Sequence, residues 1–125
     1  MTENEIASQI IHHAIELHRQ TGPGLLESVY ETALAYDLQA AGLHVAQQVP
    51  MPFIYKDVHM EIGYRIDLIV GSKVLVELKS VDSLAPVHFA QTLTYLKLSG
   101  IKLGLLINFN NRLLKDDIHR LVNNL

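Results

Sequence analysis

The stretch from Val58 to Lys79 constrains the fold more strongly than any other part of the chain. Between Val58 and Val70, apolar residues occupy nearly every second position, which is the period of a β-strand with one buried face. Gly71-Ser72 then provides a turn, and the alternation resumes from Lys73 to Lys79. Because two strands joined by so short a turn pair antiparallel, the sequence predicts a β-hairpin here.

Segments with a helical period flank this hairpin. We expect one helix over residues 3–20, begun by a capping box at Thr2 and Glu5, a second over residues 25–41, and a third over residues 86–99. The second and third are each followed by a glycine, which commonly ends a helix. A last helix is indicated by the spacing of five apolar residues: Leu113, Leu114, Ile118, Leu121 and Val122.

Two further strands complete the predicted sheet. Residues 43–55 are β-like but are interrupted by Pro50 and Pro52, which is typical of an edge strand or a bulge. Residues 101–109 form a short apolar run suited to burial on both faces. The order α-α-β-β-β-α-β-α predicts an α/β fold in which helices flank a mixed sheet of about four strands. We expect residues 1–125 to form a single domain, since this length is near the commonest domain size.

Composition excludes several classes of protein. Apolar residues make up 49% of the chain and charged residues 18%, whereas a disordered chain needs low hydrophobicity and high charge. No apolar run is long enough for a transmembrane helix, and the first residues do not resemble a secretory signal, so we expect a cytoplasmic protein without a membrane partner. The absence of cysteine excludes a disulfide, a thiolate nucleophile and a cysteine-ligated metal.

The charge balance bears on the partners that the chain can bind. Ten lysines and arginines stand against 13 acidic residues, which gives a net charge of −3. This balance lacks the basic surplus that drives nonspecific nucleic-acid binding, and it counts against a protein that coats DNA. It counts less against an enzyme with clustered acids, because bound cations would offset their charge.

Three charged residues of the predicted hairpin form the main candidate site. Glu77 and Lys79 are two positions apart on one strand, so their side chains leave the same face, and Asp67 lies on the neighbouring strand. Carboxylates on adjacent strands can bind one Mg²⁺, and a lysine beside them can orient or deprotonate an attacking water. The alternative is a structural salt bridge on a solvated face of the sheet.

Two helices carry further candidates. Glu27 lies at the margin of the apolar arc of its helix and could be a third carboxylate, although an acid in a first turn also favours the helix dipole. Glu31, one turn later, is expected in solvent, with a second-metal role as the alternative. In the helix over residues 86–99, one polar strip holds His88, Gln91 and Tyr95, which could face Lys79 or a phosphate or could form an ordinary exposed face.

Four motifs resemble those of the GxxExxY proteins, a family placed in the PD-(D/E)xK nuclease superfamily. They are GLLESVY at residues 24–30, RIDL at 65–68, VELKS at 76–80 and QTLTYLK at 91–97. The likeness extends from about Ile6 to Leu125 and keeps the motifs in order. It implies an α-β-β-β-α-β core, which the predicted element order contains.

The resemblance also implies roles for individual residues. Asp67 matches the metal-binding aspartate of the superfamily, and Glu77 and Lys79 match its acidic ligand and catalytic lysine. Glu27 matches a helical glutamate found in many members. The pair at positions 91 and 95 resembles the Q-x-x-x-Y motif of the RecB-like branch. Ile66 stands where the superfamily name has a proline, and many active members also lack this proline.

These observations lead to a hypothesis of metal-dependent phosphodiester hydrolysis, with DNA favoured over RNA. Asp67, Glu77 and the main-chain carbonyl of Leu78 would bind Mg²⁺ or Mn²⁺, and Glu27 would bind it directly or through water. Lys79 would activate the attacking water, with Gln91 positioning Lys79 or that water. The candidates for substrate contact are the remaining polar residues: Tyr95, His88 and Arg65.

Two other function classes stay open at this stage. The first is a non-catalytic module that keeps the nuclease fold and binds nucleic acid or protein. The second is a metal-dependent hydrolase of a small phosphorylated molecule, which would need no basic groove. For a nuclease, a homodimer or a protein partner could supply the basic surface that the chain lacks.

Overall fold

The computed structural model describes residues 1–60 and 63–125. The order of helices and strands along the chain contains the expected α-β-β-β-α-β core, with the short strands β2 and β3 inserted after its first strand. The elements are α1 (Glu3–Thr21), α2 (Glu27–Ala40), β1 (Val45–Pro50), β2 (Phe53–Tyr55), β3 (Val58–Met60), β4 (Arg65–Val70), β5 (Val74–Lys79), α3 (Pro86–Ser99), β6 (Leu103–Asn108), the 3₁₀-helix η1 (Leu114–Asp117) and β7 (Ile118–Val122).

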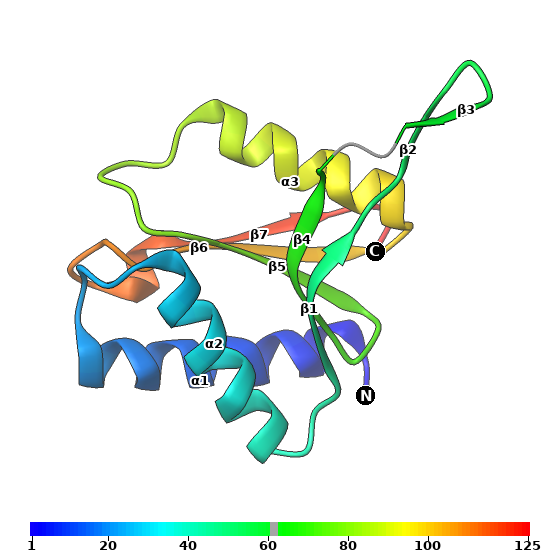
Figure 1. Cartoon of the computed structure of the whole chain (residues 1–125). Coiled ribbons are helices and arrows are strands. Elements are labelled where there is room, and N and C mark those ends of the chain that lie inside the picture. The colour runs from blue at the N-terminus through cyan, green and yellow to red at the C-terminus, as the bar shows by residue number, and fades with distance from the viewer. Residues whose placement is uncertain (61–62) are drawn as a thin grey trace.

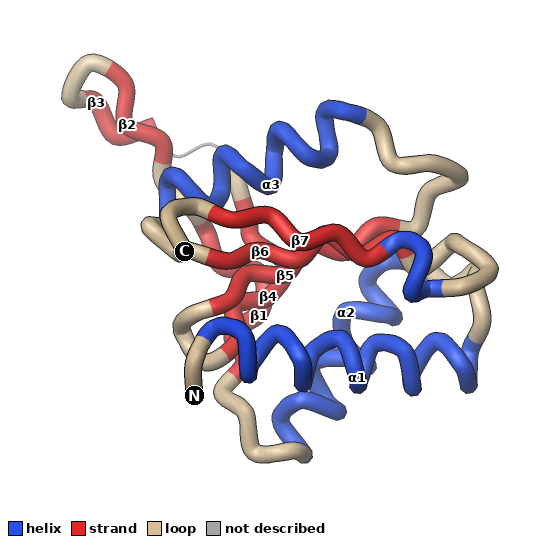
Figure 2. Tube along the Cα trace, turned by 180° about the vertical axis from the view of Figure 1, so that it is seen from behind, coloured by secondary structure: helices blue, strands red, loops and turns tan. Residues whose placement is uncertain are grey.

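A five-stranded mixed sheet with the order β1-β4-β5-β6-β7 forms the centre of the fold. Among the described strands, only β5 and β6 run parallel, and α3 makes the crossover between them, as a parallel connection requires. The helices α1 and α2 cover one face of the sheet, and α3 covers the other (Figures 1 and 2). Together these layers confirm the predicted α/β fold, with five strands in the sheet instead of about four.

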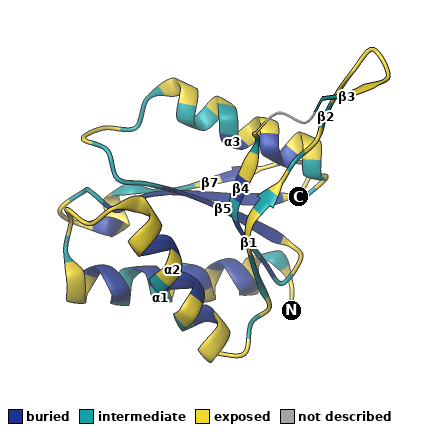
Figure 3. Cartoon of the chain, viewed as in Figure 1, coloured by how far each residue is buried: buried dark blue, intermediate teal, exposed yellow. Residues whose placement is uncertain are grey.

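Apolar side chains fill both spaces between the sheet and its helices. The larger core lies under α1 and α2 and takes Val74, Val76 and Leu78 from β5. The smaller core lies under α3 and takes Leu75 from the same strand, as the predicted alternation requires. Figure 3 shows β5 and β6 as the most deeply buried strands. Among the described residues, no helix is long and apolar enough to cross a membrane.

The predicted hairpin is confirmed only over its second half. β4 pairs antiparallel with β5, with Leu68 opposite Val76 and Val70 opposite Val74, and the chain turns at Gly71-Ser72. The segment Val58–Met60 instead pairs with Phe53–Tyr55 to form a separate two-stranded ribbon. The expected single strand from Val58 to Val70 is therefore wrong, and its residues 61 and 62 lie outside the described part of the chain.

The expected last helix is also wrong. Residues 114–117 form one 3₁₀ turn, and Ile118–Val122 pairs antiparallel with β6 as the strand β7. All six residues of β6 are buried, so its free edge needs hydrogen-bond partners that a helix could not supply. This long-range pairing overrides the helix-like spacing of the apolar residues. By contrast, the expectation of an edge strand is confirmed, because β1 lies at one end of the sheet.

Candidate active site

The candidate site lies where β4 and β5 stop pairing. Their backbone pairing ends at Leu68 and Val76. Beyond that point, the main-chain N–H of Asp67 donates to Oε1 of Glu77 at 3.2 Å, and the N–H of Leu78 donates to Oδ2 of Asp67 at 2.9 Å. Each carboxylate thus takes the place of a ladder hydrogen bond. The structure therefore brings together the two acids that strand pairing predicted as neighbours.

A break in β1 and β4 accompanies this arrangement. The β1–β4 ladder pairs Gln47 with Leu68 and Val49 with Ile66 but omits the residues between them, and Gln48 there has a φ of 50°. Leu68 packs under α1 and α2, whereas Ile66 packs under α3. The sequence pattern predicted that Ile66 and Leu68 share one face of the sheet. This prediction is wrong, because the two side chains lie on opposite faces on either side of Asp67.

Burial controls the charge of Glu77. Its side chain is 4% exposed, and burial together with the nearby negative charge of Asp67 raises its pKa from 4.5 to about 9. Lys79 lowers this pKa without reversing the effect of burial. Glu77 is therefore neutral at pH 7 when no cation is bound.

The main chain of β5 contributes a third oxygen at the same place. The carbonyl of Lys79 accepts from the N–H of Phe109 at 2.8 Å, which directs it toward β6. The main-chain N–H of the adjacent Leu78 points the opposite way, toward β4, since it donates to Asp67. The N–H and C=O of one strand residue lie on the same side, so the Leu78 carbonyl also points toward Asp67. Lys79 itself is half-buried and has no ion pair within the described chain.

Glu31 is the residue that sequence analysis placed wrongly. It is 8% exposed instead of solvated, because α2 packs it against β1. Its carboxylate accepts from Nε2 of Gln47 at 3.2 Å and of Gln48 at 2.6 Å, and the Gln48 amide also donates to Oδ1 of Asp67 at 3.1 Å. Burial raises the pKa of Glu31, while the two amides oppose the shift. Gln48 thus links a second buried acid to Asp67.

Glu27 lies at the border of the site. It is exposed at the start of α2, and its Oε2 accepts from the N–H of Ser80 at 3.4 Å, directly after Lys79. The Ser80 hydroxyl donates to the carbonyl of Leu25 at 3.0 Å, which ties the end of β5 to the start of α2. Glu27 thus contacts the main chain directly after β5, and no hydrogen bond joins it to the carboxylates of Asp67 or Glu77 in the described residues.

A buried tyrosine explains how the 24–30 motif places Glu27. The ring of Tyr30 stacks on Phe109 with centroids 4.4 Å apart, and its hydroxyl donates to the carbonyl of Gly22 at 2.6 Å. The same hydroxyl accepts from the N–H of Leu25 at 3.1 Å. Gly24 within this loop has a φ of 104°, which favours glycine. The motif therefore fixes the loop that leads into α2.

The α3 candidates divide into two groups. Nε2 of Gln91 donates to the hydroxyl of Tyr95 at 3.1 Å, and Tyr95 is 3% exposed. Burial, followed by the charges of Glu77 and Asp67, raises the pKa of Tyr95. Its ring packs in the core under α3 with Ile66 and Leu75, which lie one residue before Asp67 and two residues before Glu77. His88 instead accepts from the N–H of Ala85 at 3.0 Å and caps the helix.

Arg65 lies at the start of β4. Its side chain is exposed, and no ion pair involves it among the described residues. Next to it along the chain, Tyr64 lines a cavity of about 270 Å³ together with Gln91 and three other residues of α3. The cavity therefore lies between α3 and Tyr64, the residue that precedes β4.

Comparison with known proteins identifies the superfamily of the chain. A sequence model of the PD-(D/E)XK nuclease superfamily matches residues 4–121. The chain belongs to this superfamily. The superfamily predicted from the motifs is thus confirmed, while the narrower resemblance to GxxExxY proteins stays a prediction. No curated protein and no solved structure matches the chain significantly.

PD-(D/E)XK nucleases typically use divalent metals, and the oxygens of this member fit one. Among the described residues, no group of three or more His, Cys, Asp and Glu side chains is arranged to hold a metal. Mg²⁺, however, commonly takes only one or two carboxylates and completes its coordination with water and substrate phosphate. Asp67, Glu77 and the Leu78 carbonyl provide such a set, and the buried Glu77 would lose its proton readily beside a cation.

Proposed function

We propose that the chain is a metal-dependent nuclease that hydrolyses phosphodiester bonds of nucleic acid, with DNA as the favoured substrate. The observation that supports this most is the contact between the buried Glu77 and Asp67 at the unpaired end of β4 and β5, with Lys79 two residues away. Membership of the nuclease superfamily supports the same chemistry.

In this proposal the acids and one carbonyl hold the cation. Asp67, Glu77 and the Leu78 carbonyl would bind Mg²⁺ or Mn²⁺, and Glu27 would take part through water because it is tied to Ser80. When bound, the cation supplies Lewis-acid and charge stabilisation to the phosphate. Through Gln48, Glu31 would hold Asp67 in place and add negative charge near the site.

Lys79 and Gln91 would act on the attacking water. The water oxygen forms a bond to phosphorus, one ester P–O bond breaks, and the proton of the water passes to the leaving oxygen. Lys79 would orient and help deprotonate this water. The Tyr95 hydroxyl accepts a hydrogen bond from the amide nitrogen of Gln91. The amide oxygen of Gln91 would then accept from Lys79 or from the water.

Cleavage assays on labelled single-stranded DNA, duplex DNA and RNA test the proposal. We expect wild type to cleave at least one substrate with Mg²⁺ or Mn²⁺ and to stop when EDTA is added. Asp67→Asn should be inactive, whereas Asp116→Asn, the same change at an exposed acid of η1, should retain activity. A folded wild type that cleaves none of these substrates with either cation would point to the non-catalytic module.

Salt dependence separates nucleic acid from a small phosphorylated substrate. The KM for nucleic acid should rise with salt because each contacted phosphate releases counterions on binding. A small phosphodiester such as bis(p-nitrophenyl) phosphate should show little dependence. Efficient, salt-insensitive turnover of the small ester without turnover of nucleic acid would favour the small-molecule hydrolase.

A further inference from the structure

The β2–β3 ribbon is a feature that the proposed cleavage chemistry does not use. It lies outside the five-stranded sheet and projects beyond the end of α3 (Figure 1). Figure 3 shows most of the ribbon in the colour of exposed residues. Its exposed large apolar residues are Ile54 at 55%, Tyr55 at 51% and Val58 at 55%. A two-stranded ribbon is marginally stable by itself, so a projecting one with exposed apolar side chains suggests a binding role.

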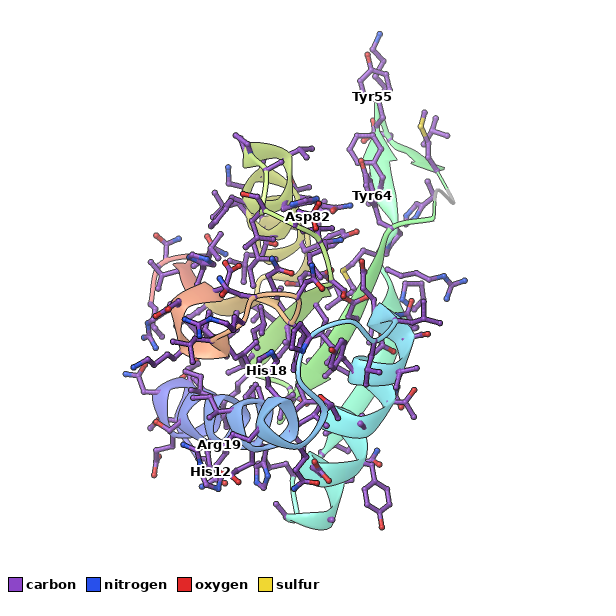
Figure 4. All side chains as sticks on the ribbon, turned by 90° about the vertical axis from the view of Figure 1, so that its left-hand side faces the viewer. His12, His18, Arg19, Tyr55, Tyr64 and Asp82 are labelled. Atoms are coloured by element: carbon purple, nitrogen blue, oxygen red, sulfur yellow. The ribbon has the colours of Figure 1, made fainter. Side chains whose placement is uncertain are left out.

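A row of four aromatic rings connects this ribbon with the candidate site. The rings of Tyr55 and Phe53 lie nearly parallel with centroids 6.5 Å apart, and Phe53 meets the ring of Tyr64 edge-on at 6.4 Å. Tyr64 in turn meets Tyr95 edge-on at 5.9 Å. Figure 4 shows Tyr55 toward the tip and Tyr64 closer to the body of the protein. The row ends at the strands that carry the carboxylates, because Tyr95 packs with Ile66, which precedes Asp67, and with Leu75, which lies two residues before Glu77.

The turn at the tip places a cation on the outermost ring. Lys56 and Asp57 have φ values of 50° and 62°, and positive φ at both central residues is the pattern of a type I′ turn, which fits the twist of a ribbon. The register sets Tyr55 opposite Val58, and Nζ of Lys56 lies 5.5 Å from the centroid of the Tyr55 ring. An aromatic face and a positive charge therefore occur together at the tip.

We propose that this aromatic row binds single-stranded nucleic acid and leads it into the Asp67–Glu77 site. Bases would stack on Tyr55 and Phe53, with Lys56 contacting phosphate. The cavity lined by Tyr64 and α3 lies beside the route to the site. This inference rests on the proposed nuclease function and specifies its substrate as a single strand.

Charge and accessibility favour a single strand over a duplex. Binding to duplex DNA depends largely on phosphate contacts by lysine and arginine, and this chain has ten such residues against 13 acids. Stacking on aromatic rings contributes about 1–3 kcal/mol per base and needs no net positive charge. Only unpaired bases expose their faces for such stacking.

Fluorescence anisotropy with labelled oligothymidylate and its duplex with oligoadenylate tests this inference. The full chain is used with EDTA, so that binding is measured without cleavage. We expect wild type to bind the single strand more tightly than the duplex, and Tyr55→Ala to weaken single-strand binding about tenfold. Tyr55→Trp should retain the affinity. Tyr36→Ala, the same change at an exposed tyrosine of α2, should behave as wild type.

Three results would overturn the inference: no detectable binding of the single strand, wild-type affinity of Tyr55→Ala, or a preference for the duplex. Light scattering on the same proteins identifies the competing explanation, since a Tyr55-dependent dimer with unchanged oligonucleotide binding would make the ribbon an interface between copies. If the nuclease proposal fails while this inference holds, the results differ from those three. In that case, Tyr55-dependent binding persists in EDTA although wild type cleaves nothing with Mn²⁺.

Discussion

Cleavage by Lys79→Ala should fall at least about 100-fold below wild type, while its Mn²⁺ affinity stays within a few-fold of wild type. Lys79 lies two residues beyond Glu77 on β5, so its ammonium can reach a water at the site without belonging to the set of oxygen donors. A loss of this size is typical when a side chain that orients or deprotonates the attacking water is removed. Single-turnover cleavage and Mn²⁺ titration on the same preparations measure the two quantities.

The matched control for this variant is Lys115→Ala, which removes an exposed lysine of η1. It should retain both cleavage and Mn²⁺ binding. If Lys79→Ala is folded but loses cleavage and cation binding together, Lys79 holds the acids in place and its assigned role is wrong. Cleavage at the wild-type rate would also contradict the role.

Replacing Glu77 with glutamine should stabilise the protein in the absence of a cation. Glutamine resembles the neutral carboxyl that burial imposes, and it can still accept the N–H of Asp67. Each pH unit above the ordinary pKa of a glutamate costs wild type about 1.4 kcal/mol, because the unfolded chain gains stability by losing the proton. The variant avoids this cost, so its free energy of unfolding at pH 7 should be about 3 kcal/mol higher. For a chain of this size, the melting temperature should rise by about 10 °C. Differential scanning calorimetry in EDTA measures both.

The pH dependence of this effect has a definite sign. Because the folded protein keeps the Glu77 proton up to about pH 9 and the unfolded chain loses it near pH 4.5, wild type should lose stability as the pH rises between these values. Glu77→Gln should lack this loss, and the two proteins should converge below pH 4.5. Glu16→Gln, at an exposed ion pair with Arg19, should change stability by less than about 1 kcal/mol. A Glu77→Gln variant less stable than wild type at pH 7 would contradict this account of Glu77.

Local sequence signals were sufficient for most of the fold. The capping box at Thr2 and Glu5 and the Pro86 start of α3 depend on neighbouring residues, and both occur as predicted. Two parts of the β structure were predicted wrongly, one because of a distant partner and the other because of a local turn. Ile118–Val122 became a strand because β6 needed a neighbour, and Val58–Met60 left the main sheet because a type I′ turn paired it with β2.

The same distinction applies to the site. The two-residue period of the strands and the short turn between them were enough to predict that Asp67 lies beside Glu77. The spacing of four residues on a helix was enough to predict that Gln91 lies beside Tyr95. Glu31 was misplaced because its burial depends on how α2 packs against β1. The only local signal was its position one turn after Glu27, and nothing in the sequence indicated the positive φ of Gln48 that lets its amide link Glu31 to Asp67.

Isothermal titration of Mn²⁺ into folded wild type and Glu77→Gln tests the central claim most directly. If Asp67, Glu77 and the Leu78 carbonyl hold the cation, wild type binds one Mn²⁺ and releases the Glu77 proton, so the heat depends on the ionisation enthalpy of the buffer. Glu77→Gln, although more stable, should lose at least about tenfold in affinity and release no proton. Equal binding by the two proteins would contradict the account.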